Sequence, residues 1–89
     1  MVNNRRSELK IISRILNLSK EGAKKTEILY QGNLSYTQLQ SYLSYLIKKD
    51  ILEERMVKNN GVSSKVYKPT KKGFLFLDDV NKVLSYLES

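Results

Sequence analysis

Residues 24–49 read KKTEILYQGNLSYTQLQSYLSYLIKK and carry the clearest structural signals in the chain. The first eight of them predict a short helix, residues 24–31. Gly32 and Asn33 follow, and both residue types tolerate the left-handed backbone conformation that commonly ends a helix. We therefore expect this first helix of the segment to stop at Gly32.

The second half of the segment predicts a longer helix with a sharp beginning. Ser35 and Gln38 form the S-x-x-Q pattern of a capping box, in which each residue satisfies a backbone amide of the other. The helix should therefore begin at Tyr36 and continue to about Lys49. Two helices joined by about three residues, the second sharply capped, are typical of a helix-turn-helix.

This second helix is amphipathic on a wheel of 100° per residue. Its apolar face is formed by Leu39, Tyr42, Leu43, Leu46 and Ile47. The opposite face is formed by Thr37, Gln40, Ser41, Ser44 and Lys48. We expect the apolar face to pack in the core and the polar face to point outward.

A further helix is predicted before this segment, at residues 7–19. Ser7 suits the N-cap position, and Glu8 suits the positive end of the helix that follows it. The apolar residues cover about half of the wheel, which is more than one packing partner requires. The sequence therefore predicts one side against the core and another against a second subunit.

A β-hairpin is predicted after the helix-turn-helix segment. Residues 51–57 mix apolar and charged side chains as a half-exposed strand does, and residues 65–68 alternate as a return strand. Residues 58–64 have the composition of a turn, with Asn60-Gly61 as its strongest point. Pro69 ends the return strand because proline cannot donate a ladder hydrogen bond.

The chain ends in a predicted helix of residues 71–88, capped by Thr70. Its apolar stripe consists of Phe76, Leu77, Val80, Val83, Leu84 and Leu87. A helix of this length, about 27 Å at 1.5 Å per residue, overhangs so small a body. We therefore expect the stripe to join two subunits in a homodimer, with heptad-like spacing at Leu77, Val80, Leu84 and Leu87.

The order helix, helix, helix, hairpin, helix predicts an α+β, mostly α fold, a winged helix-turn-helix with a C-terminal dimerisation helix. Residues 1–70 would form the winged helix-turn-helix domain, and residues 71–89 would form the coiled-coil-like dimerisation helix. No linker, internal repeat or low-complexity run is evident. The chain is therefore read as one small domain with an appended helix.

The chain resembles the small archaeal winged-helix DNA-binding proteins that dimerise through a C-terminal antiparallel coiled coil. That group includes chromatin-associated proteins and transcription regulators. The resemblance covers nearly the whole chain, in the patterns 9–12, 15–16, 22–28, 33–36, 39, 42–43, 46, 51–52, 67, 70, 72–73 and 76–77. The sequence departs from the group in a shorter final helix and in a relatively long wing at residues 58–64.

The resemblance and the helical wheel together imply a mode of DNA binding. A major groove about 12 Å wide admits one helix, so the polar face of the second helix would contact base edges. Those base contacts would be Thr37 on a thymine methyl, Gln40 in paired hydrogen bonds to adenine, and Ser41, Ser44 and Lys48. Phosphate contacts would come from Arg5, Arg6, Lys24, Lys25, Thr26, Ser35 and Tyr36, and wing contacts from Lys58, Asn59, Asn60 and Lys65.

Composition supports a polyanionic partner. Sixteen basic residues stand against nine acidic ones, for a net charge of +7. Residues 1–76 hold fifteen basic and six acidic residues, or +9, whereas residues 77–89 hold one and three, or −2. A strongly basic small domain is typical of nucleic-acid binding. The acidic C-terminal segment should lie away from the bound polyanion.

The residue types that are missing narrow the function further. The chain contains no Cys and no His, and its four Gly are scattered. We therefore expect no enzyme activity, no cofactor and no zinc site of the usual kind. A cysteine-free chain suits a reducing cytoplasm, where a nucleoid-associated protein would lie. No apolar run is long enough to span a membrane.

Several functions remain open at this level. A dimeric regulator of transcription is the leading hypothesis, and a low-specificity chromatin protein that coats or bridges DNA is the main alternative. A winged helix that docks on another protein leaves the positive charge unexplained. RNA binding is less favoured because no aromatic platform for stacking bases is evident.

Overall fold

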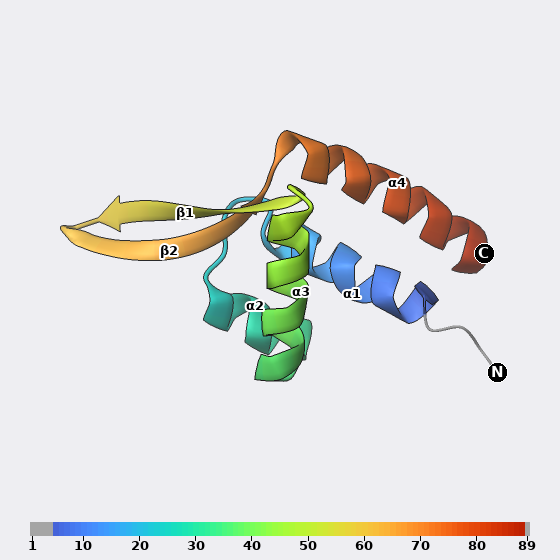
Figure 1. Ribbon diagram of the computed structural model, residues 1–89, viewed down its shortest axis with the longest axis horizontal. Helices are drawn as coiled ribbons and strands as arrows, with labels where there is room; N and C mark the ends of the chain where they lie inside the picture. Colours follow the sequence, from blue (N-terminus) through green and yellow to red (C-terminus); the bar gives the residue numbers. More distant parts are fainter. Residues whose placement is uncertain (1–4, 89) are drawn as a thin grey trace.

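A computed structural model describes residues 5–88, with side chains described from Ser7 onward. It confirms the predicted fold class: four helices and one antiparallel hairpin, mostly helical, with a long helix at the C-terminus (Figure 1). The elements in chain order are α1 (Arg5–Leu18), α2 (Lys25–Gly32), α3 (Tyr36–Lys48), β1 (Leu52–Asn59), β2 (Val62–Pro69) and α4 (Lys71–Glu88).

The turn between α2 and α3 forms as its residues predict. Asn33 takes the left-handed conformation, with φ 54°, and ends α2. The hydroxyl of Ser35 accepts a hydrogen bond from the backbone N–H of Gln38 at 3.1 Å. The Gln38 side-chain oxygen accepts in return from the N–H of Ser35 at 3.0 Å. This reciprocal pair fixes the first turn of α3 at Tyr36.

The hairpin is longer and its turn is tighter than the sequence predicted. Strands β1 and β2 pair up to Asn59 and Val62, so the seven-residue turn expected at 58–64 shrinks to Asn60 and Gly61. Both residues have positive φ, 53° and 80°. Positive φ at both turn positions matches the right-handed twist of paired strands, which explains why Asn-Gly allows so close a reversal.

The apolar faces of α1, α2 and α3 meet in one core with the base of the hairpin. Its fully buried side chains include Ile15, Leu16, Ile28, Leu39, Leu46 and Leu52. Ala23 pairs with Tyr67 as an isolated bridge beside β2, with hydrogen bonds of 2.8 and 3.0 Å. This bridge and the buried base of the hairpin join the hairpin to the body.

Helix α1 differs from its prediction at its N-terminal end and along one of its apolar sides. It already includes Arg5, so Ser7 lies inside the helix and is not its N-cap. The second apolar side of α1 was assigned to another subunit, but α4 of the same chain packs along it (Figure 1). The Ser13 hydroxyl donates to the side-chain oxygen of Asn81 at 2.9 Å, and Lys10 forms an ion pair with Glu88.

This packing changes the role of three residues in the predicted dimer stripe. Leu77, Val80 and Leu84 are 2%, 4% and 8% exposed within the single chain, so they stabilise the subunit itself. Val83 and Leu87 stay outside that contact, 44% and 52% exposed. The stripe is therefore divided between an inner contact with α1 and an outer flank.

The beginning of α4 is tied to the end of α3. The Thr70 hydroxyl donates to the carbonyl oxygen of Asp50 at 2.6 Å and accepts from the N–H of Gly73 at 2.9 Å, which makes Thr70 the N-cap as predicted. Gly73 lies so close to the residue before β1 that an added Cβ would stand 2.0 Å from the Ile51 carbonyl oxygen. Only glycine fits at this position.

None of the helices within residues 5–88 combines the length and the apolar composition that a membrane span requires.

Candidate nucleic-acid interface

The polar face of α3 points away from the body. Leu39, Leu43 and Leu46 are 0–2% exposed in the core, and the wheel therefore turns the opposite side of the helix outward. The five predicted base-contact residues are all exposed there: Thr37, Gln40, Ser41, Ser44 and Lys48. Their own subunit therefore does not cover the side chains that would contact a DNA groove.

One edge of this face is ordered by α2. The ammonium of Lys25, the first residue of α2, donates to the Gln40 side-chain oxygen at 2.8 Å. The same ammonium lies 5.5 Å from the centre of the Tyr36 ring, within the range of a cation–π contact. Lys25 thus contacts a residue of the predicted base-contact face, and its own contact with phosphate stays a prediction.

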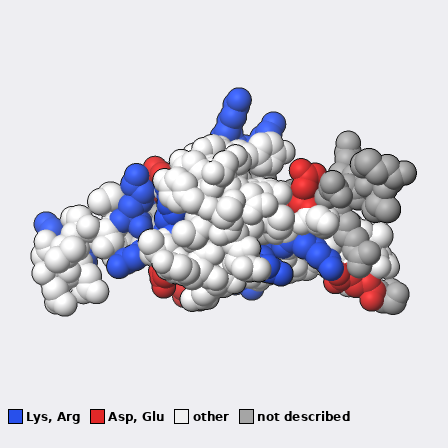
Figure 2. All heavy atoms as spheres, turned by 90° about the horizontal axis from the view of Figure 1, so that it is seen from below, with Lys and Arg blue, Asp and Glu red and all other residues white. Residues whose placement is uncertain are grey.

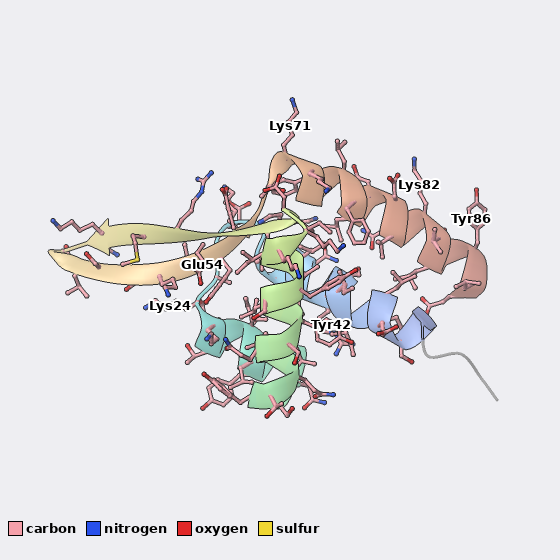
Figure 3. All side chains as sticks on the ribbon, in the orientation of Figure 1. Lys24, Tyr42, Glu54, Lys71, Lys82 and Tyr86 are labelled. Carbon is pink, nitrogen blue, oxygen red and sulfur yellow. The ribbon has the colours of Figure 1, made fainter. Side chains whose placement is uncertain are left out.

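The other edge of the face borders a groove between α1 and α3. The groove is lined by Glu8, Leu9, Ile12, Thr37, Gln38, Ser41, Tyr42 and Tyr45. Tyr42 points from α3 toward α1 (Figure 3). Burial, and to a lesser degree the carboxylate of Glu8, raises the pKa of the Tyr42 hydroxyl. The sequence indicated only that Glu8 lies in the first turn of its helix. Its place in this groove depends on how α1 and α3 cross, which no local pattern predicts.

The residues predicted to contact phosphate differ in their exposure and in whether their polar groups already form hydrogen bonds. Lys24 and Thr26 are exposed at the start of α2, although the backbone N–H of Lys24 already donates to Glu27 at 2.8 Å. The backbone N–H of Ser35 donates and its hydroxyl oxygen accepts within the capping box. Tyr36 is 60% exposed. The side chains of Arg5 and Arg6 lie outside the described residues.

The wing has two chemically different faces. Because side chains alternate along a strand and cross-strand partners share a face, Lys58 and Lys65 lie on one side together with Met56. Asn59 lies on the other side, and Asn60 is in the turn. That second side, which we call the valine face, forms a groove with the N-cap residue of α2, lined by Lys24, Val57, Asn59, Val62, Ser64 and Val66. The sequence did not indicate the valine face because the predicted turn was too long. Extending the alternation of the return strand back through Ser64 to Val62 would have placed these valines on one side.

A hydrogen-bonded cluster lies at the base of the side of the wing that carries Lys58 and Lys65, which we call the lysine face. The hydroxyl of buried Tyr67 donates to the Glu54 carboxylate at 3.1 Å, and the Lys65 ammonium lies 3.7 Å from the same oxygen. Burial, followed by the hydrogen bond and charge of Glu54, raises the pKa of Tyr67. Glu54 therefore offsets part of the Lys65 charge, and Lys58 is the more independent cation of this face.

Apart from Lys48 in its last turn, α3 carries no charged side chain, and the other charges lie around it. Seen from the side of α2 and α3, lysine and arginine side chains border a central surface that is largely uncharged (Figure 2). Lys24 lies between α2 and the hairpin, whereas Lys71 and Lys82 project from the far side of α4 (Figure 3). Across the described residues, no group of three His, Cys, Asp or Glu is placed to hold a metal ion.

This architecture agrees with known proteins over almost the full chain. The model of the winged helix-turn-helix family matches residues 5–88. The chain belongs to the winged helix-turn-helix family. A search of curated protein sequences gave no significant match.

Solved structures resemble this winged helix closely. Sso10a-2, a DNA-binding protein from Sulfolobus solfataricus, is 25% identical with a TM-score of 0.74, over 90% of this chain and 80% of that one. A PadR-like transcription factor from Bacteroides fragilis is 26% identical with a TM-score of 0.69, over 97% and 93%. A PadR-like transcriptional regulator from Bacillus cereus is 16% identical with a TM-score of 0.76, over 97% and 90%, which shows the shared fold.

Proposed function

We propose that this winged helix binds double-stranded DNA as a homodimer and regulates transcription, with α3 in the major groove and the wing on the backbone or minor groove. The exposed polar row of α3 carries the proposal, because a buried row would have ruled out groove contact. The net charge of +7 supplies the attraction to phosphate. Similar proteins that are themselves a DNA-binding protein and a PadR-like transcription factor add support.

Base contacts in this proposal come from the centre and edges of the α3 face. Ser44 and Lys48 lie at its middle, Thr37 and Ser41 border the groove with α1, and Gln40 borders α2. Lys24, Thr26 and Tyr36 would meet phosphates beside α3. Lys58 and Lys65 would bring the lysine face of the wing to the neighbouring backbone.

The homodimer in this proposal uses the outer flank of α4. Phe76 is partly buried, and Val83 and Leu87 are exposed, so these three side chains form an apolar edge beside the inner contact with α1. A second copy covering this edge would leave residues 5–70 free to bind DNA. Two α3 helices about 34 Å apart would then enter successive major grooves of a pseudo-palindromic site.

The dimer is tested by placing a charge on the flank. Val83→Asp should shift the protein from dimer to monomer in sedimentation velocity, because it would bury an unpaired carboxylate at the contact. Ser85→Asp is the matched control, since it adds the same charge on an exposed position of α4 outside the flank. Equal sedimentation of both variants and wild type as monomers would rule out this homodimer.

DNA binding is tested by selection from random duplexes at known salt, followed by titration. A regulator should yield a consensus, and Ser41→Ala with Ser44→Ala should weaken that site by about tenfold while leaving random DNA unchanged. Lys24→Ala with Lys58→Ala should weaken all duplexes alike and reduce the salt slope. A protein that binds no duplex even at low salt would contradict the proposal and favour a protein-interaction module.

The same titration separates the regulator from a chromatin protein that coats DNA. If each subunit neutralises about five phosphates, log K against log salt should have a slope near −9 for the dimer. A coating protein would show that slope with hardly any dependence on sequence. A regulator would add a marked preference for its consensus at every salt concentration.

A further inference from the structure

The contact between Lys25 and Gln40 constrains what α3 can recognise. Lys25 is half-buried between the two helices, and its ammonium donates to the Gln40 oxygen at 2.8 Å. The same ammonium lies over the Tyr36 ring, one turn before Gln40 on α3, at 5.5 Å from the ring centre. The three side chains therefore form one cluster at the α2 edge of the outward face.

The chemistry of the cluster sets its hydrogen-bonding character. A lysine ammonium has three donors and no acceptor, whereas a glutamine amide has one oxygen and two N–H donors. Gln40 must therefore turn its oxygen toward Lys25, and its N–H₂ group is left directed away from that contact. The remaining donors of Lys25 lie beside it. The cluster presents N–H groups from both residues and a glutamine oxygen that is already engaged.

In the major groove, this pattern distinguishes the two purines. Guanine offers two acceptors, N7 and O6, whereas adenine offers one acceptor, N7, and one donor, N6–H₂. Paired hydrogen bonds from glutamine to adenine use the amide oxygen as the acceptor for N6–H₂, and Lys25 already occupies one of the two lone pairs of the Gln40 oxygen. In this cluster a Lys25 donor would instead face the adenine donor, so the adenine contact expected for Gln40 is disfavoured.

We propose that Lys25 and Gln40, braced by Tyr36, act as one donor unit that selects guanine over adenine. Lys25 is then a specificity-determining residue rather than a phosphate contact. This inference rests on the proposed DNA-binding function. It adds a base preference that neither the fold nor the charge of the protein supplies.

The experiment compares the wild type with four variants on duplexes that differ at one base pair. The wild type, Lys25→Met, Lys25→Arg, Lys24→Met and Gln40→Ala are each put through selection from random duplex DNA at fixed salt. They are then titrated by fluorescence anisotropy against the selected site and against versions with each guanine replaced by adenine or 7-deazaguanine. Lys24→Met is the matched control, because it removes the neighbouring charge and leaves the cluster intact.

The wild type should prefer guanine at one position per half-site by roughly 5- to 150-fold, the range of a good paired base contact. It should also lose affinity for 7-deazaguanine, which lacks the N7 acceptor. Lys25→Met should reduce the guanine preference to less than about threefold, since it frees the Gln40 oxygen. Lys24→Met should weaken all duplexes alike and keep the preference, and Lys25→Arg should restore much of it.

Two results would overturn the inference alone. One is that the wild type binds DNA but prefers adenine, or shows no base preference, at every position whose preference changes in Gln40→Ala. The other is a Lys25→Met protein that weakens guanine and adenine duplexes equally, as Lys24→Met does. A wild type that binds no duplex would instead overturn the proposed function, and the inference with it.

The contact itself can be tested without DNA. In ¹⁵N–¹H spectra of the free protein, the side-chain amide of Gln40 should shift on Lys25→Met and stay in place on Lys24→Met. An amide that does not respond to loss of Lys25 would contradict the cluster. Unchanged thermal unfolding of Lys25→Met would show that the fold survives the substitution.

Discussion

Helices α3 and α4 are both amphipathic, yet the structure uses their apolar stripes differently. In the stripe of α3, Leu39, Leu43 and Leu46 are buried in the core of their own subunit, whereas Tyr42 is half-buried and Ile47, expected in the core, is 37% exposed; the opposite polar row is left outside. The stripe of α4 is divided. Leu77 is 2% exposed against the body, whereas Val83 on the same helix is 44% exposed.

The difference shows how far a helical wheel can be taken. A wheel states which residues share a face, and it did so correctly for both helices. It does not state what covers that face, because the partner is chosen by the tertiary arrangement. For α3 only the core was available, but for α4 both α1 and a second subunit were candidates.

The largest expected effect comes from the point where α4 leaves the body. Gly73→Ala should lower the free energy of unfolding by more than about 4 kcal/mol or abolish folding, because its Cβ would overlap the Ile51 carbonyl oxygen. Urea denaturation followed by circular dichroism measures this. Gly32→Ala is the control: its Cβ would meet only side chains at 3.5 Å or more, so it should be tolerated.

The next effect tests the division of the α4 stripe directly. Leu77→Ala should cost about 2–5 kcal/mol, like Leu39→Ala in α3, since each leaves a cavity in a buried site. Val83→Ala should change the stability of the isolated subunit by less than about 0.5 kcal/mol. Stabilities that depend on protein concentration for Val83→Ala, but not for Leu77→Ala, would mean that the inner and outer residues had been assigned the wrong way round.

A smaller effect should separate the beginning of α3 from its exposed face. Ser35→Ala should lower stability by about 1 kcal/mol, because the amide of Gln38 loses its acceptor in the capping box. Ser44→Ala, an exposed serine on the same helix, should leave thermal unfolding nearly unchanged. Identical melting temperatures for the two variants would show that the capping box does not stabilise α3.

The smallest effect is a dependence of stability on alkaline pH. The raised pKa of Tyr67 means that the folded state holds this proton more tightly than the unfolded state, whose tyrosine titrates near pH 10. The stabilisation is present below pH 10 and is lost as the pH rises through the raised pKa. Tyr67→Phe should therefore show a shallower fall of stability above pH 10.

Urea midpoints measured between pH 8 and 11 test this expectation. Lysine titration affects both proteins and cancels in the comparison. Tyr42, whose pKa is also raised, remains in the variant, so part of the alkaline decrease should persist. Parallel curves for wild type and Tyr67→Phe would contradict a role for Tyr67 in this pH dependence.

Local chemistry made much of the fold predictable. The positive φ of Asn33, the Ser35 capping box and the Thr70 cap each depend on residues close in sequence, and all three were foreseen. The hairpin position was foreseen for the same reason. Its length was not, because polar residues such as Ser63 and Ser64 are compatible with both a turn and an exposed strand, and cross-strand pairing decides between them.

The candidate site was predictable as a face and unpredictable as a set of contacts. The outward row of α3 follows from the period of 3.6 residues. The contact between Lys25 and Gln40 joins residues 15 positions apart on two helices, and the crossing of those helices alone brings them together. Glu8 reaches the groove beside Tyr42 for the same reason.

The sequence by itself determined the order of the elements, the ends of α2 and α3, the inward leucines of α3 and the excess of positive charge. These properties depend on interactions within a few residues or on composition. Only the tertiary structure decided that α1 covers half of the α4 stripe, that the wing has a lysine and a valine face, and that Lys25 engages Gln40. Such contacts depend on how whole elements cross, because packing brings distant residues together that no local pattern connects.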